Sequence, residues 1–158
     1  ELETVIRYFD DLPKTEFNFG LIHGDHRKGN VLTDGEKIHF IDFDLPRYYW
    51  YMDDVARPFF SSILQKQTHW ENKLYPYLKG YSSISQLSRE DIGLFTWFLR
   101  IKALNIYLWT KNNWKGDIAP GGMKTAQWLT LLSDFIRNPS WLSSVQCVVD
   151  DAITKLGV

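Results

Sequence analysis

Two neighbouring stretches decide the fold: residues 21–32 read Leu-Ile-His-Gly-Asp-His-Arg-Lys-Gly-Asn-Val-Leu, and residues 38–44 read Ile-His-Phe-Ile-Asp-Phe-Asp. The first holds a polar loop that passes into an apolar segment, and the second is rich in residues that favour strands. The pair Asp34-Gly35 between them is a strong signal for a tight turn. The sequence therefore predicts a β-hairpin with a polar loop at its entrance.

Three side chains that can offer oxygen ligands belong to this hairpin: Asp25 and Asn30 on the loop, and Asp42 on the return strand. With strand pairing centred on the two-residue turn, we expect Asn30 to face His39. Asp42 then lies roughly 10 Å further along, at about 3.3 Å per residue, and shares the open end of the hairpin with Asn30. The Asp25 loop curls over that end. A carboxylate and an amide oxygen suit a Mg²⁺ ion that bridges phosphates, and a second carboxylate can accept a hydroxyl proton.

The spacing Asp-x-x-x-x-Asn, followed by an acid about a dozen residues later, resembles the catalytic loop and metal-binding motif of protein kinases. The particular form His-Gly-Asp-x-x-x-x-Asn with Ile-Asp-Phe-Asp is more similar to the aminoglycoside phosphotransferase/choline kinase family of small-molecule phosphotransferases. Residues 51–56, Tyr-Met-Asp-Asp-Val-Ala, resemble that family's Asp-Leu-Ala segment, which opens the next helix. The motifs cover residues 20–56, and the helical remainder agrees with the family only in type.

This resemblance implies transfer of the γ-phosphoryl group of ATP to a hydroxyl group of a small molecule, with Mg²⁺ as cofactor. Asp25 matches the catalytic base, and Asn30 and Asp42 match the Mg²⁺ ligands. The acceptor stays open, because aminoglycosides, choline, homoserine and sugars each require a different pocket chemistry. The acidic and aromatic residues of the chain do not choose among them.

Three further residues take supporting positions in the resemblance. His23 matches the histidine that supports the catalytic loop, and Asp54 matches a structural acid that caps its helix and braces that loop. Asp44 stands where the family often has an acid and is a further candidate for the site. Asp53, beside Asp54, is expected to be solvated.

The rest of the chain follows helical patterns, so we predict an α+β, mainly helical fold class. Ser88 and Asp91 form a capping-box pattern that opens a helix, and its apolar stripe from Leu94 through Trp97 to Leu108 predicts a core face. Further helices are predicted over residues 2–9, 124–137 and 144–156.

We expect one domain over residues 1–158, with a catalytic segment at 20–56 and a helical region at 57–158 on the substrate side. The family resemblance implies that this domain is the C-terminal lobe of a protein-kinase-like fold, without the N-terminal lobe. Only 22 residues precede His23, none of the ten glycines forms G-x-G-x-x-G, and the chain begins at Glu1. We therefore expect a C-terminal part of a longer protein, with the missing N-terminal lobe as its partner and weak ATP binding by itself.

The composition of the chain excludes some classes of binding partner. The 18 Lys and Arg residues nearly balance the 19 Asp and Glu residues, so the charge does not favour nucleic acid or a membrane surface. No apolar run reaches the roughly 18 residues of a membrane span. The single cysteine, Cys147, excludes an internal disulfide and fits a reducing compartment, so we expect a cytoplasmic protein.

Aromatic residues make up 16% of the chain, and the run Tyr48–Tyr51 fits either a cage for a cationic substrate or aromatic residues that cover the core.

Two other functions stay open at this point. His23, Asp25 and His26, with His39 and Asp42, could hold Zn²⁺ or a metal pair in a hydrolase. A His-x-x-Asp spacing along a strand, however, places the two side chains on opposite faces. The chain could also be a non-catalytic kinase-like module that binds a partner through its aromatic surface.

Overall fold

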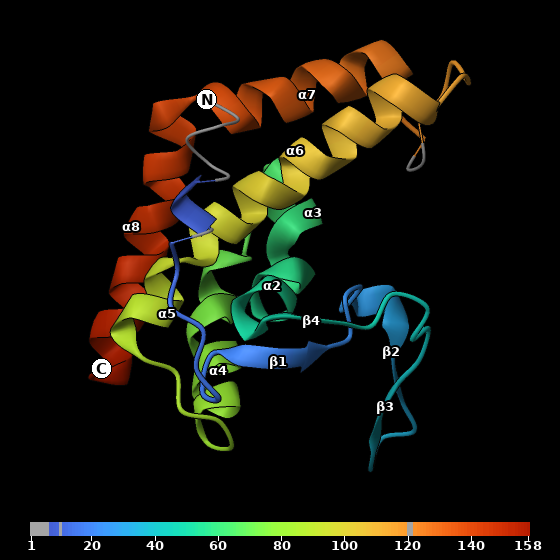
Figure 1. The fold of residues 1–158 in the computed structure, drawn as a ribbon. Coiled ribbons are helices and arrows are strands. Elements are labelled where there is room, and N and C mark those ends of the chain that lie inside the picture. Colours follow the sequence, from blue (N-terminus) through green and yellow to red (C-terminus); the bar gives the residue numbers. More distant parts are fainter. Residues whose placement is uncertain (1–6, 10, 120–121) are drawn as a thin grey trace.

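The computed structural model describes residues 7–9, 11–119 and 122–158. Within these residues, short strands come first and helices follow (Figure 1). The strands are β1 (Phe19–Ile22), β2 (Val31–Thr33), β3 (Ile38–Phe40) and β4 (Arg47–Trp50), with a 3₁₀ turn η1 (Lys28–Asn30) before β2. The predicted α+β, mainly helical class is confirmed.

The predicted hairpin forms from β2 and β3, but its register differs from the prediction. Thr33 pairs with Ile38, and the backbone N–H of Ile41 donates to the carbonyl of Asn30, so Asn30 faces Ile41 rather than His39. The reason is the turn. The Asp34 carboxylate accepts hydrogen bonds from the backbone N–H groups two and three residues later, which closes a four-residue loop instead of the expected two-residue one.

A second antiparallel pair, β1 with β4, was not predicted. Phe19 lies opposite Trp50 and Ile22 opposite Arg47, so this pair spans the start and the end of the catalytic segment. Burial increases along β4 toward α2, since Tyr48 is 73% exposed whereas Trp50 is buried. The aromatic run at residues 48–51 therefore extends from an exposed position into the core.

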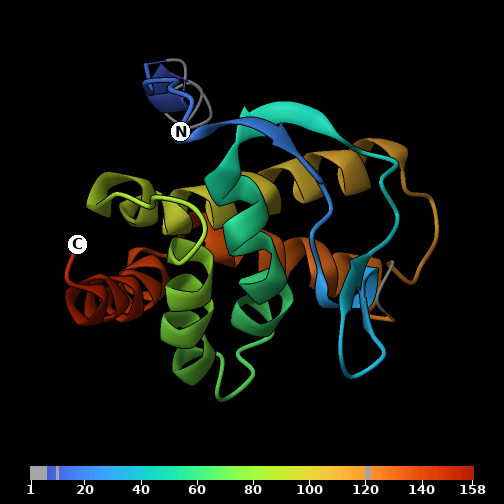
Figure 2. The ribbon, with the colours of Figure 1, turned by 90° about the horizontal axis from the view of Figure 1, so that it is seen from below.

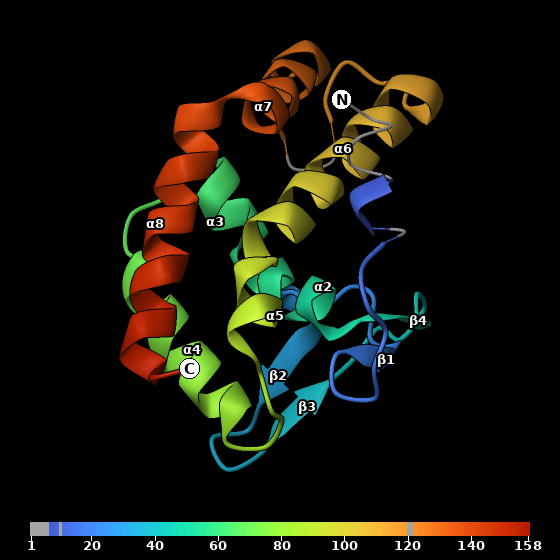
Figure 3. The ribbon, with the colours of Figure 1, turned by 60° about the vertical axis from the view of Figure 1, so that its left-hand side comes forward.

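The helical body follows directly from β4. Its elements are α2 (Tyr51–Ala56), η2 (Arg57–Phe59), α3 (Phe60–Leu64), α4 (Glu71–Ser82), α5 (Arg89–Gly93), α6 (Phe95–Asn113), α7 (Thr125–Arg137) and α8 (Pro139–Leu156). Helix α6 contacts α2, α7 and α8, and α8 also runs beside α4 and α5 (Figures 1 and 3). Helix α2 contacts both β1 and α6, and so connects the strands to the helices.

The helix ends correct two predictions and confirm two. Ser88 and Asp91 form the expected capping box, but the helix that it opens, α5, ends at Gly93, and α6 begins as a separate helix. Helix α7 agrees with the predicted 124–137. Helix α8 begins at Pro139 rather than near residue 144, because the Asn138 side chain caps it by accepting the N–H of Trp141.

One cluster of buried apolar side chains joins the strand region to the helices. On α6 the buried face is formed by Phe95, Phe98, Leu99 and Ala103, whereas Leu108 of the predicted stripe is exposed. The other two named stripe residues, Leu94 and Trp97, are only partly buried. The stripe prediction was therefore wrong in part, because α6 is enclosed by three helices whose directions the sequence does not show.

The β2–β3 hairpin stands on the opposite side of the molecule from α8 (Figures 1 and 2). The strand region also exposes an unusual number of apolar side chains, which we call the exposed apolar group. Its members are Leu21, Leu32, Ile38, Phe40, Ile41, Phe43 and Leu45. Large exposed apolar patches in soluble proteins mark surfaces for other molecules or segments.

The predicted helix over residues 2–9 lies mostly outside the described residues; residues 7–9 are helical. Among the helices described, none has the length and apolar character needed to cross a bilayer.

Candidate active site

The polar loop begins with a backbone turn at Gly24, directly after β1. Gly24 has φ of +80°, and a Cβ atom built on it would lie 2.0 Å from the carbonyl oxygen of Leu45. Only glycine fits a backbone that is both left-handed and this close to another chain segment. The loop is thereby held against residue 45, the segment that follows the return strand.

Asp54 fastens the same turn from the helical side. Its carboxylate accepts the backbone N–H of His23 at 2.6 Å and that of Gly24 at 3.0 Å. Asp54 lies inside α2 and does not cap it, because Trp50 is the N-cap residue and provides no side-chain hydrogen bond. The predicted bracing contact is therefore present, whereas the predicted helix cap is absent.

Two histidines connect the loop to its surroundings. His23 Nδ1 accepts the backbone N–H of Asp25, and its Nε2 lies 2.9 Å from the carbonyl oxygen of Ile41. A neutral ring that accepts at Nδ1 donates from Nε2, so His23 joins the loop to the residue before Asp42. His26 Nδ1 pairs with the backbone carbonyl of Asp54, and burial lowers the pKa of His26 below its usual 6.5.

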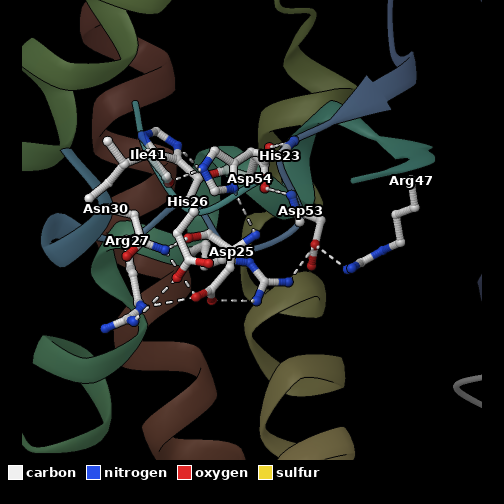
Figure 4. A network of polar contacts seen from close by, with 12 residues as sticks. His23, Asp25, His26, Arg27, Asn30, Ile41, Arg47, Asp53 and Asp54 are labelled. Atoms are coloured by element: carbon white, nitrogen blue, oxygen red, sulfur yellow. Dashed lines mark hydrogen bonds and ion pairs between the residues drawn. The ribbon is translucent and has the colours of Figure 1, made fainter. Parts of the chain in front are cut away.

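Asp25 and Asn30 are brought into direct contact at the centre of the network (Figure 4). The Asn30 amide nitrogen donates to the backbone carbonyl of Asp25 at 2.9 Å and to its Oδ2 atom at 3.1 Å. Asn30 is buried, and its Oδ1 atom accepts no hydrogen bond from the described part of the chain. The two donated bonds fix the amide, so that its oxygen stays available as a ligand.

Asp42 is connected to Asp25 by Arg27, which contacts both carboxylates. The Arg27 guanidinium contacts Asp25 Oδ2 at 2.9 Å and Asp42 Oδ2 at 4.0 Å. Asp42 has φ of +67°, a conformation uncommon for a residue with a side chain and frequent at functional sites. Two carboxylates thus face one cation, and Asn30 lies beside one of them. Carboxylate and amide oxygens are a donor set that suits a hard divalent metal.

Asp44 is placed differently from the other candidates. It is exposed and makes no hydrogen bond or ion pair with the residues that the structure describes. The structure therefore groups Asp25, Asn30 and Asp42, with His23 and Asp54 behind them, and leaves Asp44 outside this network.

The sequence reasoning missed a buried ion network on the other side of Asp25. Asp53, expected to be solvated, is buried and accepts Arg47 Nη2 at 2.9 Å and Arg57 Nη2 at 2.7 Å. Arg57 Nη1 in turn lies 3.5 Å from Asp25 Oδ1. Figure 4 shows Asp53 and Arg47 on the opposite side of Asp25 from Arg27 and Asn30. The available signal was the i, i+4 spacing of Asp53 and Arg57.

Lys102 of α6 belongs to the same charged neighbourhood. Its burial, together with the positive charge of Arg57, lowers the pKa of Lys102 to about 8, and Asp53 and Asp25 oppose that shift. Arginines and a lysine therefore accompany the acids here, so the side of Asp25 that faces the helices is rich in cations.

A zinc hydrolase requires a different arrangement from the one observed. In the described ranges, no three side chains of His, Cys, Asp or Glu converge in a way that could hold a metal ion. The hydrolase alternative is thus unsupported. A site of two carboxylates and one amide has only two side chains of these four types, so this observation does not bear on it.

Comparison with known proteins gives three similarities. Residues 1–80, about half of the chain, match the model of the phosphotransferase enzyme family. Over 103 residues, 61% of this chain, the sequence is 28% identical to amicoumacin kinase of Bacillus subtilis (strain 168) and covers 31% of that protein. A solved structure of amicoumacin kinase hAmiN in complex with AMP-PNP, Ca²⁺ and Ami shares the fold. Its TM-score is 0.71 at 17% identity, over 87% of this chain and 43% of that one.

Proposed function

The chain belongs to the phosphotransferase enzyme family, and we propose that it carries the catalytic residues of an ATP-dependent kinase acting on a small-molecule hydroxyl. The observation that carries this proposal is the contact of Asp25 with Asn30, beside Asp42, on a loop fastened from both sides. A base and a set of metal ligands are the side chains that phosphoryl transfer requires.

Asp25 is the proposed base. Its Oδ2 atom is engaged by Arg27 and Asn30, and its Oδ1 atom faces Arg57. As the acceptor oxygen bonds to the γ-phosphorus, the acceptor O–H bond breaks and its proton passes to the Asp25 carboxylate. The bond from the γ-phosphorus to the bridging oxygen breaks, and its electron pair leaves with ADP. Positioning and electrostatics carry most of such a rate enhancement.

Asn30 and Asp42 are the proposed ligands of a divalent metal ion, with Mg²⁺ as the physiological candidate. The fit rests on the free Oδ1 atom of a buried, doubly anchored amide and on a carboxylate held in a left-handed backbone conformation. When bound, a divalent ion neutralises charge on the phosphate oxygens. The solved amicoumacin kinase is in complex with AMP-PNP and Ca²⁺, which supports a divalent metal and a nucleotide donor.

The nucleotide lobe is proposed to lie outside this chain. The chain spans 31% of the curated relative and 43% of the solved one, so we propose residues 1–158 as the C-terminal lobe of a kinase-like protein. The exposed apolar group then forms the surface against which the N-terminal lobe packs. Residues 20–56 supply the chemistry, and the helical region 57–158 faces the acceptor.

The direct test uses the full-length gene product, ATP and a panel of small-molecule hydroxyl acceptors, with phosphorylated product detected by mass spectrometry. We expect transfer by the native protein and loss of turnover in Asp25→Asn and in Asp42→Asn, each with an unchanged circular dichroism spectrum. Asp11→Asn is the matched control, because Asp11 is an exposed acid remote from the loop in sequence. Turnover near the native rate in either site variant contradicts the assignment.

The lobe proposal has its own test. Residues 1–158 alone should bind Mg·ATP more weakly than micromolar in isothermal titration. Micromolar binding by this segment shows that a second lobe is not required for the nucleotide.

A further inference from the structure

Arg57 is a charged residue whose side chain is buried. Its side chain is only 5% exposed, and an isolated ion buried to this degree is unfavourable unless it is paired. The nearest carboxylates are Asp53, at 2.7 Å from Nη2, and Asp25, at 3.5 Å from Nη1. The guanidinium thus lies between one buried acid and the proposed base.

The two oxygens of the Asp25 carboxylate are held by different groups. Oδ2 faces Arg27 and Asn30 of its own loop, whereas Oδ1 faces Arg57 from the helical body. Contacts from two sides fix both the position and the rotation of a carboxylate. Arg27 is more than half exposed, so Arg57 is the more rigid of the two cationic partners.

Asp53 explains how Arg57 keeps its place. It belongs to α2 one turn before Arg57, and its Oδ2 atom accepts both Arg57 and Arg47. Nε and Nη1 of Arg57 are buried without a hydrogen bond, so the Asp53 bond holds the guanidinium and leaves Nη1 directed at Asp25. A planar guanidinium can contact two carboxylates at once, which a single ammonium group cannot do equally well.

We propose that Arg57 is a positioning residue for Asp25: held by Asp53, its buried guanidinium sets the orientation in which the Asp25 carboxylate accepts the acceptor proton. This inference rests on the proposed function, because it requires Asp25 to be the base. It assigns the role to a residue that acts through its contact with Asp25.

The test measures steady-state kinetics of the full-length gene product after Arg57→Gln. We expect kcat to fall about 10- to 100-fold, because a shift of about 1 Å in a reacting group costs that much. The KM values for ATP and acceptor should change less than about twofold. Arg47→Gln is the matched control: Arg47 also pairs with Asp53 but is not paired with Asp25, so its kcat should stay within about twofold of native.

Chemical rescue separates positioning from general support of the fold. Guanidinium ion at millimolar concentration should restore part of kcat to Arg57→Ala, and urea, which is similar in shape but uncharged, should not. Equal rescue by both, or by neither, contradicts the proposal. Where the alanine and glutamine variants do not fold, Arg57→Lys decides: we expect a several-fold lower kcat, and an unchanged kcat overturns the inference.

The outcomes also separate this inference from the proposed function. If the native protein transfers no phosphoryl group, the proposed function itself is contradicted. An active native protein whose Arg57→Gln variant keeps its kcat removes the role of Arg57 and leaves the kinase assignment standing.

Discussion

The Asp54 carboxylate lies 2.6 Å from the backbone nitrogen of His23, a residue 31 positions earlier in the chain. This contact ties the first residue of the polar loop to the first helix of the body. Because α2 also packs on β1 and α6, this contact gives the loop a connection to the helical core, in addition to its contact with the hairpin at Ile41.

Asp54→Asn should therefore destabilise the fold. The amide keeps the shape of the carboxylate, but its NH₂ group faces a backbone N–H and leaves that donor unsatisfied. We expect the free energy of unfolding to fall by about 2 kcal/mol in urea titration. Asp44→Asn, at an exposed acid without a polar partner in the described structure, should change it by less than about 0.5 kcal/mol. Equal effects of the two changes contradict the bracing role.

Gly24→Ala tests the close approach of the loop to the carbonyl of Leu45. Left-handed backbone alone costs alanine roughly 1–2 kcal/mol, and the overlap at Gly24 adds about 1–3 kcal/mol. Gly35→Ala is the matched control, since Gly35 also has positive φ (+96°) but has open space around it. Thermal unfolding should show the larger loss for Gly24→Ala, and equal losses refute the packing argument.

Arg27→Gln should strengthen divalent metal binding in the absence of nucleotide. The Arg27 guanidinium occupies the space between Asp25 and Asp42 and repels a second cation there. Given about 1 kcal/mol per unit-charge pair at 4 Å in water, we expect Ca²⁺ or Mn²⁺ affinity to rise about three- to tenfold in isothermal titration. Lys28→Gln removes an exposed charge of the same loop and should have a smaller effect. Affinity that falls in Arg27→Gln contradicts the prediction.

Lys102 makes stability depend on pH in the alkaline range. Its pKa is about 8 in the folded protein and 10.5 when unfolded. Between these values the unfolded chain holds a proton that the folded chain has released, so the free energy of unfolding rises with pH. Lys102→Met should remove this rise and increase stability at pH 7 by about 3 kcal/mol, since each pKa unit corresponds to about 1.4 kcal/mol. Denaturant titrations at pH 7 and 9.5 check both points, with the exposed Lys37→Met as control. A native slope retained in Lys102→Met contradicts the assignment.

Local chemistry made several features predictable. The Ser88 and Asp91 capping box, the hairpin at Asp34-Gly35 and the neighbourhood of Asp25 and Asn30 all depend on residues a few positions apart. The hairpin register was wrong because the Asp34 side chain closes a longer turn than the dipeptide favours. The predicted start of α8 was wrong because Asn138, the residue that ends α7, also caps α8.

The features that could not be predicted from the sequence depend on contacts between residues far apart in the chain. Strand β4 is defined by its pairing with β1, about 30 residues away. Asp53 pairs with Arg47 and Arg57 from two elements. Its i, i+4 spacing to Arg57 is a local signal, but exposed helix pairs have the same spacing, so it does not distinguish a buried acid from a solvated one. Arg57 escaped for the same reason, since its importance depends on the fold of a loop more than 30 residues earlier.

The position of α8 has a consequence for synthesis on the ribosome. Val149 and Ile153 of α8 complete the core, and the helix lies against α4, α5 and α6. At about 5–20 residues per second, roughly 2–9 seconds separate translation of residue 113 from that of residue 156. During this interval the nascent helices expose the apolar faces that α8 later covers, and such exposed surface is prone to aggregation. A stop codon introduced before Pro139 should accordingly direct the product to proteolysis rather than to a smaller folded unit.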